Sequence, residues 1–468
     1  MTTAISPPGP PSSEGPRFWD QLLELVDEKR VVPIVGQDLL RLTVDGQPVL
    51  LYPYLAERLA DYLEVPGTDL PASGALHEVA CRYLARGGDV LDIYPALKKV
   101  FPARDRLALP EPLLQLAEIQ PFQLFVTTTF DPLMAQAIDA VRFGGAERTS
   151  IYSHSLTEVL DLDPPETIRW PAVFHLLGRL SAIPDYAVTE EDTLELIHSL
   201  QTKNRELEHL FEELSRRQLL LIGSSFPDWL ARFFLRIAKG ERLWMARGKT
   251  DVVADARMRE DAALVSFLQR FSTRTKVFSG GAAEFVAELH RRWTALHPPQ
   301  EQTKAAEPSS APRTALDMVP GSVFLSYASE DRPVVEALRQ ELESAGVDVW
   351  FDRDQLEAGD DFEQKIRRNI QHCSLFVPIL SRHTLTSRRR FFRIEWDQAE
   401  RLSVQVKSSM RFIVPVAVDD VPPNDEGLPE SFRRLHWYRL DNAAIPPDLV
   451  TALKELFRDY QRSLAETS

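Results

Sequence analysis

Short apolar runs alternate with helical patterns through residues 323–464 of the chain. The run VFLSY (323–327) precedes ASED, which is expected to cap a helix in which Val335, Leu338 and Leu342 share one face. Further strands are predicted at VDVWF (347–351), SLFVPIL (374–380) and RFIVPVAV (411–418), and further helices around 362–370, 387–400 and 449–460. Apolar strands that alternate with helices indicate a parallel sheet covered on both faces. Ligands bind such sheets beyond the carboxyl ends of the strands, where SYASED and DRDQLEAGDD are expected.

The first 296 residues show the same alternation with longer helical insertions. Strands are predicted at VVPIV (31–35), FQLFVTTTF (122–130), AVFHLLG (172–178) and LLLIGSS (219–225). Helical spacing occurs in FWDQLLELV (18–26), YLAERLADYL (54–63), ALHEVACRYLA (75–85) and AAEFVAELHRRW (282–293). The fold class predicted for the chain is therefore α/β, with two doubly wound parallel-sheet domains.

Two segments rich in proline, serine and small polar residues cannot form a core. We therefore expect a disordered tail at 1–17, a domain at 18–296, a flexible linker at 297–322 and a second domain at 323–468.

The composition of the chain argues against several classes of partner and site. The net charge of −15 and the pI near 5.3 argue against broad binding of nucleic acid or anionic membranes, and the run Arg388 to Arg390 is the one compact basic cluster. Only two cysteines occur and the histidines are scattered without ligand spacing, so neither a disulfide framework nor a metal site is expected. No apolar run approaches the roughly 18 residues of a membrane span, and the first residues lack a secretory signal pattern. A cytoplasmic location is expected.

The segment SRRRFFRIEWDQAE (387–400) places a glutamate on the apolar side of a predicted helix. At about 100° per residue, the apolar arc consists of Phe391, Phe392, Trp396, Ala399 and Leu402. Glu395 falls within that arc, where an unpaired carboxylate costs several kcal/mol. Either the arc borders a cleft in which the charge is used, or Arg389 or Arg393 neutralises Glu395.

The ordered motifs of residues 323–464 resemble those of TIR (Toll/interleukin-1 receptor) domains. VFLSYASED is similar to the first-strand box of the family, VDVWFDRDQLEAGDDF to its second strand and BB loop, and SLFVPILS to its third strand. FFRIEW is similar to the helix that carries the catalytic glutamate of TIR enzymes. The resemblance implies a flavodoxin-like fold. It also implies hydrolysis or cyclisation of NAD+, because many TIR domains of bacterial and plant immunity carry out that reaction.

On this resemblance, Glu395 is the catalytic residue and Phe391 stands where the family commonly has Trp. Tyr327 and Asp352 match pocket residues of the first-strand box and the BB loop, and Phe391 and Trp396 are aromatic neighbours of the glutamate. Simpler interpretations remain open: Tyr327 packs in the core and Asp352 forms a turn. NAD+ is the implied substrate, and no metal is required.

Residues 18–296 resemble the divergent, Rossmann-like sirtuin-like domains of bacterial antiphage defence proteins. LFVTTTFDPL, VFHLLGRL, AVTEEDTLELI and LLIGSSFPDWLARFFLR are similar to family segments and follow the family order. The resemblance implies His175 as the catalytic histidine and Asp131 as a pocket residue, although a core histidine and a helix cap are the alternatives. Two departures weaken catalysis: Gln37 and Asp38 follow Gly36 in the cofactor loop, and Thr129 replaces the catalytic Asn.

Three functions follow from these resemblances. The first is a bacterial antiviral immune effector whose TIR domain hydrolyses or cyclises NAD+ on oligomerisation, with the sirtuin-like domain regulating or assembling it. The second is a TIR scaffold that binds other TIR domains without catalysis. The third places NAD+ cleavage in the sirtuin-like domain, with the TIR domain as the sensor. Self-association is the expected partnership, with another defence protein or a phage-derived trigger as further possibilities.

Overall fold

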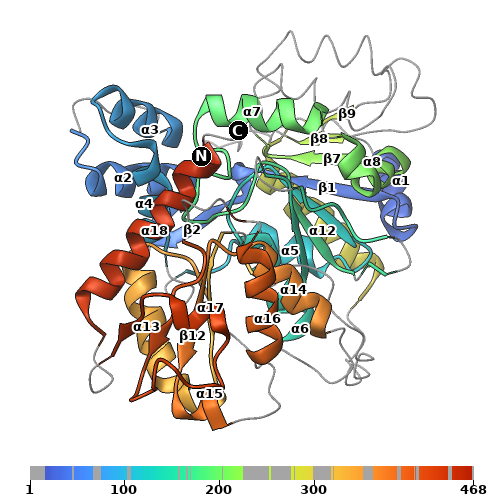
Figure 1. Ribbon diagram of the computed structural model, residues 1–468. Coiled ribbons are helices and arrows are strands. Elements are labelled where there is room, and N and C mark those ends of the chain that lie inside the picture. The colour runs from blue at the N-terminus through green and yellow to red at the C-terminus, as the bar shows by residue number, and fades with distance from the viewer. Residues whose placement is uncertain are drawn as a thin grey trace, which may run out of the picture.

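Two parallel sheets, each flanked by helices, form two bodies that pack against each other (Figure 1). The computed structural model describes residues 16–44, 47–66, 75–102, 107–155, 159–164, 167–168, 170–202, 204–224, 252–254, 276–278, 280–298, 318–319, 321–351, 362–386, 392–404, 406, 411–440 and 445–465. The α/β class predicted from the sequence is confirmed in both bodies.

The N-terminal body is built on a sheet of strand order β5-β6-β4-β1-β7-β8-β9, in which all pairs are parallel. The strands are β1 (Val31–Val35), β4 (Leu124–Thr127), β5 (Ser150–Ser153), β6 (Ala172–His175), β7 (Gln218–Ile222), β8 (Val252–Ala254) and β9 (Lys276–Val277). A separate antiparallel pair is formed by β2 (Arg41–Val44) and β3 (Gln47–Leu50). The central strands β1, β4, β6 and β7 are buried along their whole length, which explains their continuous apolar runs.

Helices cover both faces of this sheet. They are α1 (Pro16–Asp27), α2 (Leu51–Tyr62), α3 (Leu76–Ala85), α4 (Val90–Val100), α5 (Glu111–Glu118), α6 (Leu133–Phe143), α7 (Glu190–Thr202), α8 (Glu208–Arg216) and α12 (Ala282–Leu296), with the short helices η1 (Gln37–Leu39) and η4 (Asn204–Leu207). Two core clusters result. One joins one sheet face to α1, α2, α5, α6 and α12, and the other joins the opposite face to α7 and α8.

The C-terminal body has a sheet of strand order β11-β10-β12-β13-β14, and all four pairs are parallel. The strands are β10 (Val323–Ser326), β11 (Val349–Trp350), β12 (Leu375–Leu380), β13 (Val416–Ala417) and β14 (Tyr438–Arg439). In chain order this arrangement is 2-1-3-4-5, the flavodoxin-like topology. Its switch point lies at β10, because the first connection runs to β11 on one side and the next to β12 on the other.

The helices of the C-terminal body divide between the two sheet faces. They are η5 (Ser329–Asp331), α13 (Arg332–Ser344), α14 (Phe362–Gln371), α15 (Arg382–Thr386), α16 (Phe392–Ser403), α17 (Glu430–Arg434) and α18 (Pro447–Ala465). Val323 and Leu325 of β10 pack with α13 and α18, whereas Phe324 packs with α14, α16 and α17. This alternation is the ordinary pleat of a strand, and it decides which side chains of β10 can reach α16.

Several elements differ from the prediction. The strands β2, β3, β5, β8, β9 and β14 and the helices α4 to α8, α15 and α17 were not predicted. Asp331 precedes α13, but its side chain makes no cap bond; that part of the capping prediction was wrong, because the carboxylate accepts hydrogen bonds from another loop. Most of the predicted linker lies outside the described residues, although Met318 near its end is buried in the core of the C-terminal body.

A closed loop of the N-terminal body, residues 178–186, inserts into the core of the C-terminal body. The amide of Ala187 donates to the carbonyl of Leu177 at 2.9 Å and closes the loop. Gly178 has a φ of +82°, and a Cβ there would lie 2.4 Å from the carbonyl oxygen of Asp185, so only glycine fits. At the tip, Ala182 and Ile183 are fully buried in the cluster formed by β10, α13 and α18.

Polar contacts fix this interdomain interface. The amide of Ala182 donates to Oδ2 of Asp348 at 2.6 Å, and Lys98 of α4 forms an ion pair with the same carboxylate. The side-chain amide of Gln461 on α18 donates to the carbonyl of Ala182, and Arg458 pairs with Asp92 of α4 at 2.5 Å. In Figure 1, α18 accordingly runs beside α4.

The interface lies at one edge of the C-terminal sheet. Gly321 precedes β10 and lies near Ile183, while Gly346 and Asp348 precede β11 and contact α4 or the closed loop. All of these contacts are at the amino ends of the strands. The carboxyl edge of the C-terminal sheet is therefore on the other side from the interface.

We expect Asp348→Ala to loosen the interface, because it leaves the amide of Ala182 and the ammonium of Lys98 without an acceptor. A hydrogen bond to a charged group is worth about 1.5–3 kcal/mol, so the hydrogen-exchange protection of the Ala182 amide should fall about tenfold or more. The control is Asp397→Ala, which removes an exposed carboxylate paired with Arg401 on α16. Unchanged protection at Ala182 in Asp348→Ala would show that these bonds do not hold the two bodies together.

Candidate active site

Glu395 lies in the first turn of α16 and is only 2% exposed. Phe392, Trp396 and Ala399 on the same helix face are equally buried, so the apolar arc predicted from the sequence exists and contains the glutamate. Leu402 packs at the margin of that core, and Phe391 lies outside the described residues.

Ser326 binds the Glu395 carboxyl group. It is the last residue of β10, is completely buried, and its hydroxyl donates to Oε2 of Glu395 at 2.5 Å. The pleat of β10 explains the contact, since Ser326 and Phe324 share the face that packs on α16. The Glu395 carboxyl group is thus held at the carboxyl end of the central strand, at the switch point where ligands bind in sheets of this topology.

The arginine that could neutralise Glu395 has other partners. Arg393 donates to the carbonyl of Thr384 at 3.0 Å and to the carbonyl of Gly427. Its guanidinium also lies 5.0 Å from the centroid of the Trp396 ring, and burial lowers its pKa. Arg389, the other possible partner, lies outside the described residues.

The other predicted pocket residues are placed differently. Tyr327 is buried on the opposite sheet face, where its ring stacks on Phe351 at 5.9 Å. Trp396 adjoins Glu395 in the chain and packs on Phe392 and Phe432, and its buried indole N–H has no hydrogen-bond partner. Asp352 lies outside the described residues. The structure therefore brings together Ser326, Glu395 and Trp396, and the pocket roles of Tyr327, Asp352 and Phe391 stay predictions.

A second polar cluster joins the loops after β10 and β12 at the same sheet edge. The hydroxyl of Ser381 donates to Oδ2 of Asp331 at 2.5 Å, and Nδ1 of His383 lies 2.8 Å from Oδ1. This hydrogen bond raises the pKa of His383. Sequence reasoning did not single out this cluster, although polar residues directly after two apolar strands were a usable signal.

In the N-terminal body, His175 ends β6 and is buried beside the end of β4. Its Nδ1 lies 3.2 Å from the carbonyl of Thr129 and 3.0 Å from the hydroxyl of Thr127, which fixes Nδ1 as the protonated nitrogen. Nε2 is buried and has no hydrogen-bond partner. Burial, and then the charge of Arg179, lower the pKa of His175 to about 4. The imidazole is therefore neutral at pH 7.

Asp131 lies near the same sheet edge, at the start of α6. Its Oδ1 accepts the amide of Leu133 at 3.0 Å, which is a capping contact, whereas Oδ2 is buried without a partner. Burial raises the pKa of this carboxyl group. Thr129, Asp131 and His175 thus lie near one another at the sheet edge. Burial lowers the pKa of His175 and raises the pKa of Asp131, so the uncharged form of each side chain is favoured.

The loop after β1 packs tightly against the end of β7. A Cβ on Gly36 would lie 2.1 Å from the carbonyl oxygen of Gly223, so the ends of β1 and β7 are in direct contact. The amide of Asp38 donates to that carbonyl, and the amide of Leu40 donates to the carbonyl of Gln37. Amides that would bind a phosphate in a nucleotide loop are thus engaged within the protein.

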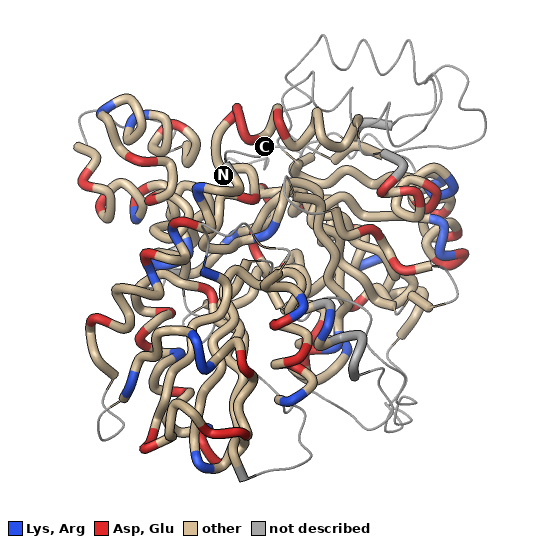
Figure 2. Tube along the Cα trace, viewed as in Figure 1, with Lys and Arg blue, Asp and Glu red and all other residues tan. Residues whose placement is uncertain are grey.

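The described ranges contain no group of three or more His, Cys, Asp and Glu side chains arranged to hold a metal ion. Within the same ranges, no helix combines the length and apolar character needed to cross a membrane. Cys81 and Cys373 are both free thiols. Basic and acidic residues are interspersed along the helices of both bodies (Figure 2).

Comparison with known protein families matches a domain in each of the two bodies. Residues 123–263 match the family described as SIR2-like domain, and residues 323–456 match the family described as TIR domain. The chain carries a SIR2-like domain followed by a TIR domain. Glu395 lies within the matched part of the TIR domain, and Asp131 and His175 lie within the matched part of the SIR2-like domain.

Three curated relatives match a quarter of the chain or less. NAD(+) hydrolase PdTIR of Paracoccus denitrificans is 33% identical over 123 residues, which cover 25% of this chain and 39% of that protein. NAD(+) hydrolase TcpA of a Theionarchaea archaeon is 31% identical over 20% of this chain and 27% of its own length. The 2' cyclic ADP-D-ribose synthase AbTIR of Acinetobacter baumannii is 29% identical over 20% of this chain and 34% of its own. The chain thus spans well under half the length of each relative.

Among solved structures, the TIR domain of the Toll-related receptor TRR-2 from Hydra magnipapillata matches 30% of this chain and 97% of that chain. Its sequence identity is 18% and the TM-score is 0.22.

The Asp331–His383 contact predicts a pH-dependent contribution to stability. Because the pKa of His383 is raised in the folded protein, the contact stabilises the fold fully below the pKa of an unfolded histidine, and this contribution is lost as the pH rises through the folded pKa. Titration of the imidazole by NMR should therefore give a pKa above about 6.5.

Asp331→Asn should lower that pKa. Asp419→Asn is the control, because Asp419 is a more weakly acting neighbour of His383 and its replacement should cause a smaller change. Equal effects of the two substitutions would contradict a direct Asp331–His383 contact.

Proposed function

We propose that this protein cleaves the bond between nicotinamide and ribose in NAD+, in its TIR domain, with Glu395 as the catalytic residue. The observation that carries the proposal is the Glu395 carboxyl group, buried in an apolar helix face and held by Ser326 at the switch point of the sheet. The curated relatives of this domain support NAD+ as the substrate, since two are named NAD(+) hydrolases and one is named a cyclic ADP-D-ribose synthase.

The chemistry needs little more than one fixed carboxylate. When the glycosidic bond breaks, both bonding electrons stay on the pyridine nitrogen, so a cationic ring leaves as neutral nicotinamide and needs no general acid. The ribose becomes oxocarbenium-like, as in glycoside hydrolysis. A carboxylate held beside it stabilises positive charge that develops only in the transition state. Water, or a nucleophile within the same molecule, then adds to the anomeric carbon and loses its proton.

Ser326 contributes by orientation. A hydroxyl that donates to one carboxylate oxygen fixes the plane of the carboxyl group. The buried rings of Phe392 and Trp396 exclude water around the carboxylate and lower the local dielectric. Charge stabilisation is stronger in such an environment than in water.

The SIR2-like domain is the weaker candidate for this reaction. A general base works best when its pKa is near the operating pH, and the pKa of His175 is about 4. The loop after β1 also has its amides engaged, and Thr129 stands in the position of the catalytic Asn. We propose that the SIR2-like domain regulates or assembles the TIR domain through the interdomain interface.

The biological setting is part of the same proposal. Assembly into an oligomer would let neighbouring TIR domains complete the side of the site formed by the segment around Asp352. A bacterial antiviral role, with another defence protein or a phage-derived molecule as the trigger, agrees with the two resemblances. NAD+ depletion by the assembled protein would then be the effector step.

Glu395→Gln should reduce NAD+ turnover at least 100-fold, because it keeps the shape of the side chain but removes the charge that stabilises the transition state. The measurement is NAD+ consumption by the full chain, with nicotinamide, ADP-ribose and cyclic products separated by chromatography. Asp397→Asn, on the exposed side of the same helix, is the matched control and should turn over NAD+ at the wild-type rate.

His175→Gln measured in parallel separates the alternatives. Loss of turnover in His175→Gln but not in Glu395→Gln would assign the reaction to the SIR2-like domain. Absence of turnover by the wild-type chain under every assembly condition would favour a non-catalytic TIR scaffold.

Ser326→Ala should lower kcat about tenfold or more, because a hydrogen bond to a charged group is worth about 1.5–3 kcal/mol. KM should change less, since Ser326 positions Glu395 and is not expected to touch NAD+. Ser326→Thr restores the hydroxyl and should recover most of the rate. A Thr variant as slow as the Ala variant would indicate a packing role for this residue instead.

A further inference from the structure

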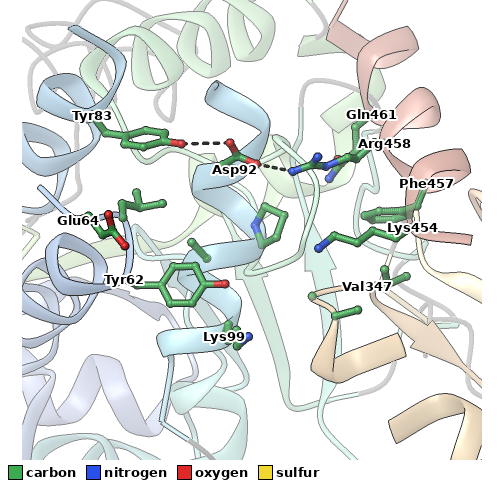
Figure 3. Close-up of a pocket in the computed structure, with 15 residues that line it drawn as sticks. Tyr62, Glu64, Tyr83, Asp92, Lys99, Val347, Lys454, Phe457, Arg458 and Gln461 are labelled. Atoms are coloured by element: carbon green, nitrogen blue, oxygen red, sulfur yellow. Dashed lines mark hydrogen bonds and ion pairs between the residues drawn. The ribbon is translucent and has the colours of Figure 1, made fainter. Parts of the chain in front are cut away.

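A cavity of about 300 Å³ lies between the SIR2-like domain and the TIR domain (Figure 3). One wall consists of α3, α4 and the end of α2, and the other consists of α18 and the turn between α13 and β11. Its volume is at the lower end of the range for small-molecule sites, about 300–1,000 Å³. Because that turn leads into the amino end of β11, the cavity is separate from the site around Glu395.

The lining has an excess of positive charge in a strongly acidic chain. Lys454 and Arg458 lie one turn apart on α18, and Lys99 projects from α4. Of the two lining carboxylates, Asp92 accepts the Tyr83 hydroxyl at 3.1 Å and pairs with Arg458 at 2.5 Å, as the dashed lines of Figure 3 show. The other is an exposed glutamate.

Three cations line the cavity and can contact a ligand. Lys454 forms no ion pair or hydrogen bond with any residue of the described ranges, and in Figure 3 its ammonium points from α18 toward the centre of the cavity. The ammonium of Lys99 lies 5.3 Å from the centroid of the Tyr62 ring. Arg458 uses one nitrogen for Asp92 and retains further N–H donors.

Gln461 adds a buried acceptor to this wall. The side chain is fully buried, and its Nε2 donates to the carbonyl of Ala182, which fixes its orientation. Its Oε1 is buried and has no hydrogen-bond partner. An unsatisfied acceptor beside these cations fits a ligand that is anionic and also carries an O–H donor.

We propose that this interdomain cavity binds a small organic phosphate with free hydroxyl groups, a sugar phosphate or a nucleoside monophosphate. Lys454 and Arg458 bind the phosphate, and Oε1 of Gln461 accepts a hydroxyl of the ligand. Since the cavity walls come from both domains, the bound ligand stabilises the docked arrangement of the two domains. The proposal does not depend on which domain cleaves NAD+.

Titration calorimetry on the full chain tests the site with ribose 5-phosphate, adenosine 5'-monophosphate, inorganic phosphate and ribose. At least one of the two esters should bind saturably, and tighter than inorganic phosphate or ribose. Preference for ribose 5-phosphate identifies a sugar-phosphate site, and preference for the nucleotide identifies a nucleotide site. No saturable binding of either ester up to about 10 mM would overturn the proposal, as would equal affinity for inorganic phosphate.

Lys454→Glu should weaken the preferred ester at least tenfold, and Lys454→Arg should retain binding. Lys29→Glu makes the same charge change in the turn after α1, away from the cavity, and should bind as the wild type does. Exchange protection of the Ala182 amide, measured in each variant, shows whether the domains stay docked. Wild-type affinity in Lys454→Glu, with protection retained, would place the ligand elsewhere.

Discussion

The Glu395 carboxyl group is buried in the apolar face of α16, and a buried group of that kind needs a donor. Ser326 supplies one because the pleat of β10 directs residues 324 and 326 toward α16. A slip of one residue in the pairing of β10 with β12 would present Leu325 or Tyr327 to that helix instead. The hydrogen bond between Ser326 and Glu395 therefore requires both this register of the sheet and this packing of α16. The same constraint locates the candidate active site at the switch point of the sheet.

The two domains share an architecture, but they differ in the hydrogen bonding of the buried polar side chains at the carboxyl edge of the sheet. In the TIR domain, Glu395 and Asp331 both receive hydroxyl donors. In the SIR2-like domain, one nitrogen of His175 and one oxygen of Asp131 are buried without partners, and burial shifts both pKa values toward the neutral forms. An edge that favours uncharged groups is poorly suited to proton transfer at pH 7. This difference, more than the fold, separates the catalytic candidate from the regulatory one.

The sequence predicted the parts of the fold that depend on local burial. The central strands were found because they are apolar throughout, and Glu395 was found because it breaks a helical pattern. The edge strand β5 was missed because its residues SIYS lack an apolar run, and α4 was missed because Pro95 interrupts its pattern. Ser326 was not singled out, since a serine at a strand end also suits a turn. The contact of Ala182 with Asp348 joins residues 166 positions apart, which no local pattern encodes.

The position of the interface limits how the SIR2-like domain can control the TIR domain. The closed loop at residues 178–186 follows β6, so it rises from the same sheet edge that holds His175, and its tip enters the amino edge of the TIR sheet. The contacts between the described parts of the two domains thus lie at the amino edge, whereas Ser326 and Glu395 lie at the opposite edge. If the SIR2-like domain regulates the TIR domain as proposed, this arrangement favours control that restricts the approach of a second TIR domain or holds α18 and β11 in place. Only a few residues separate His175 from Ala182. A conformational change around His175 can therefore be transmitted along the chain to the interface contact of Ala182 with Asp348.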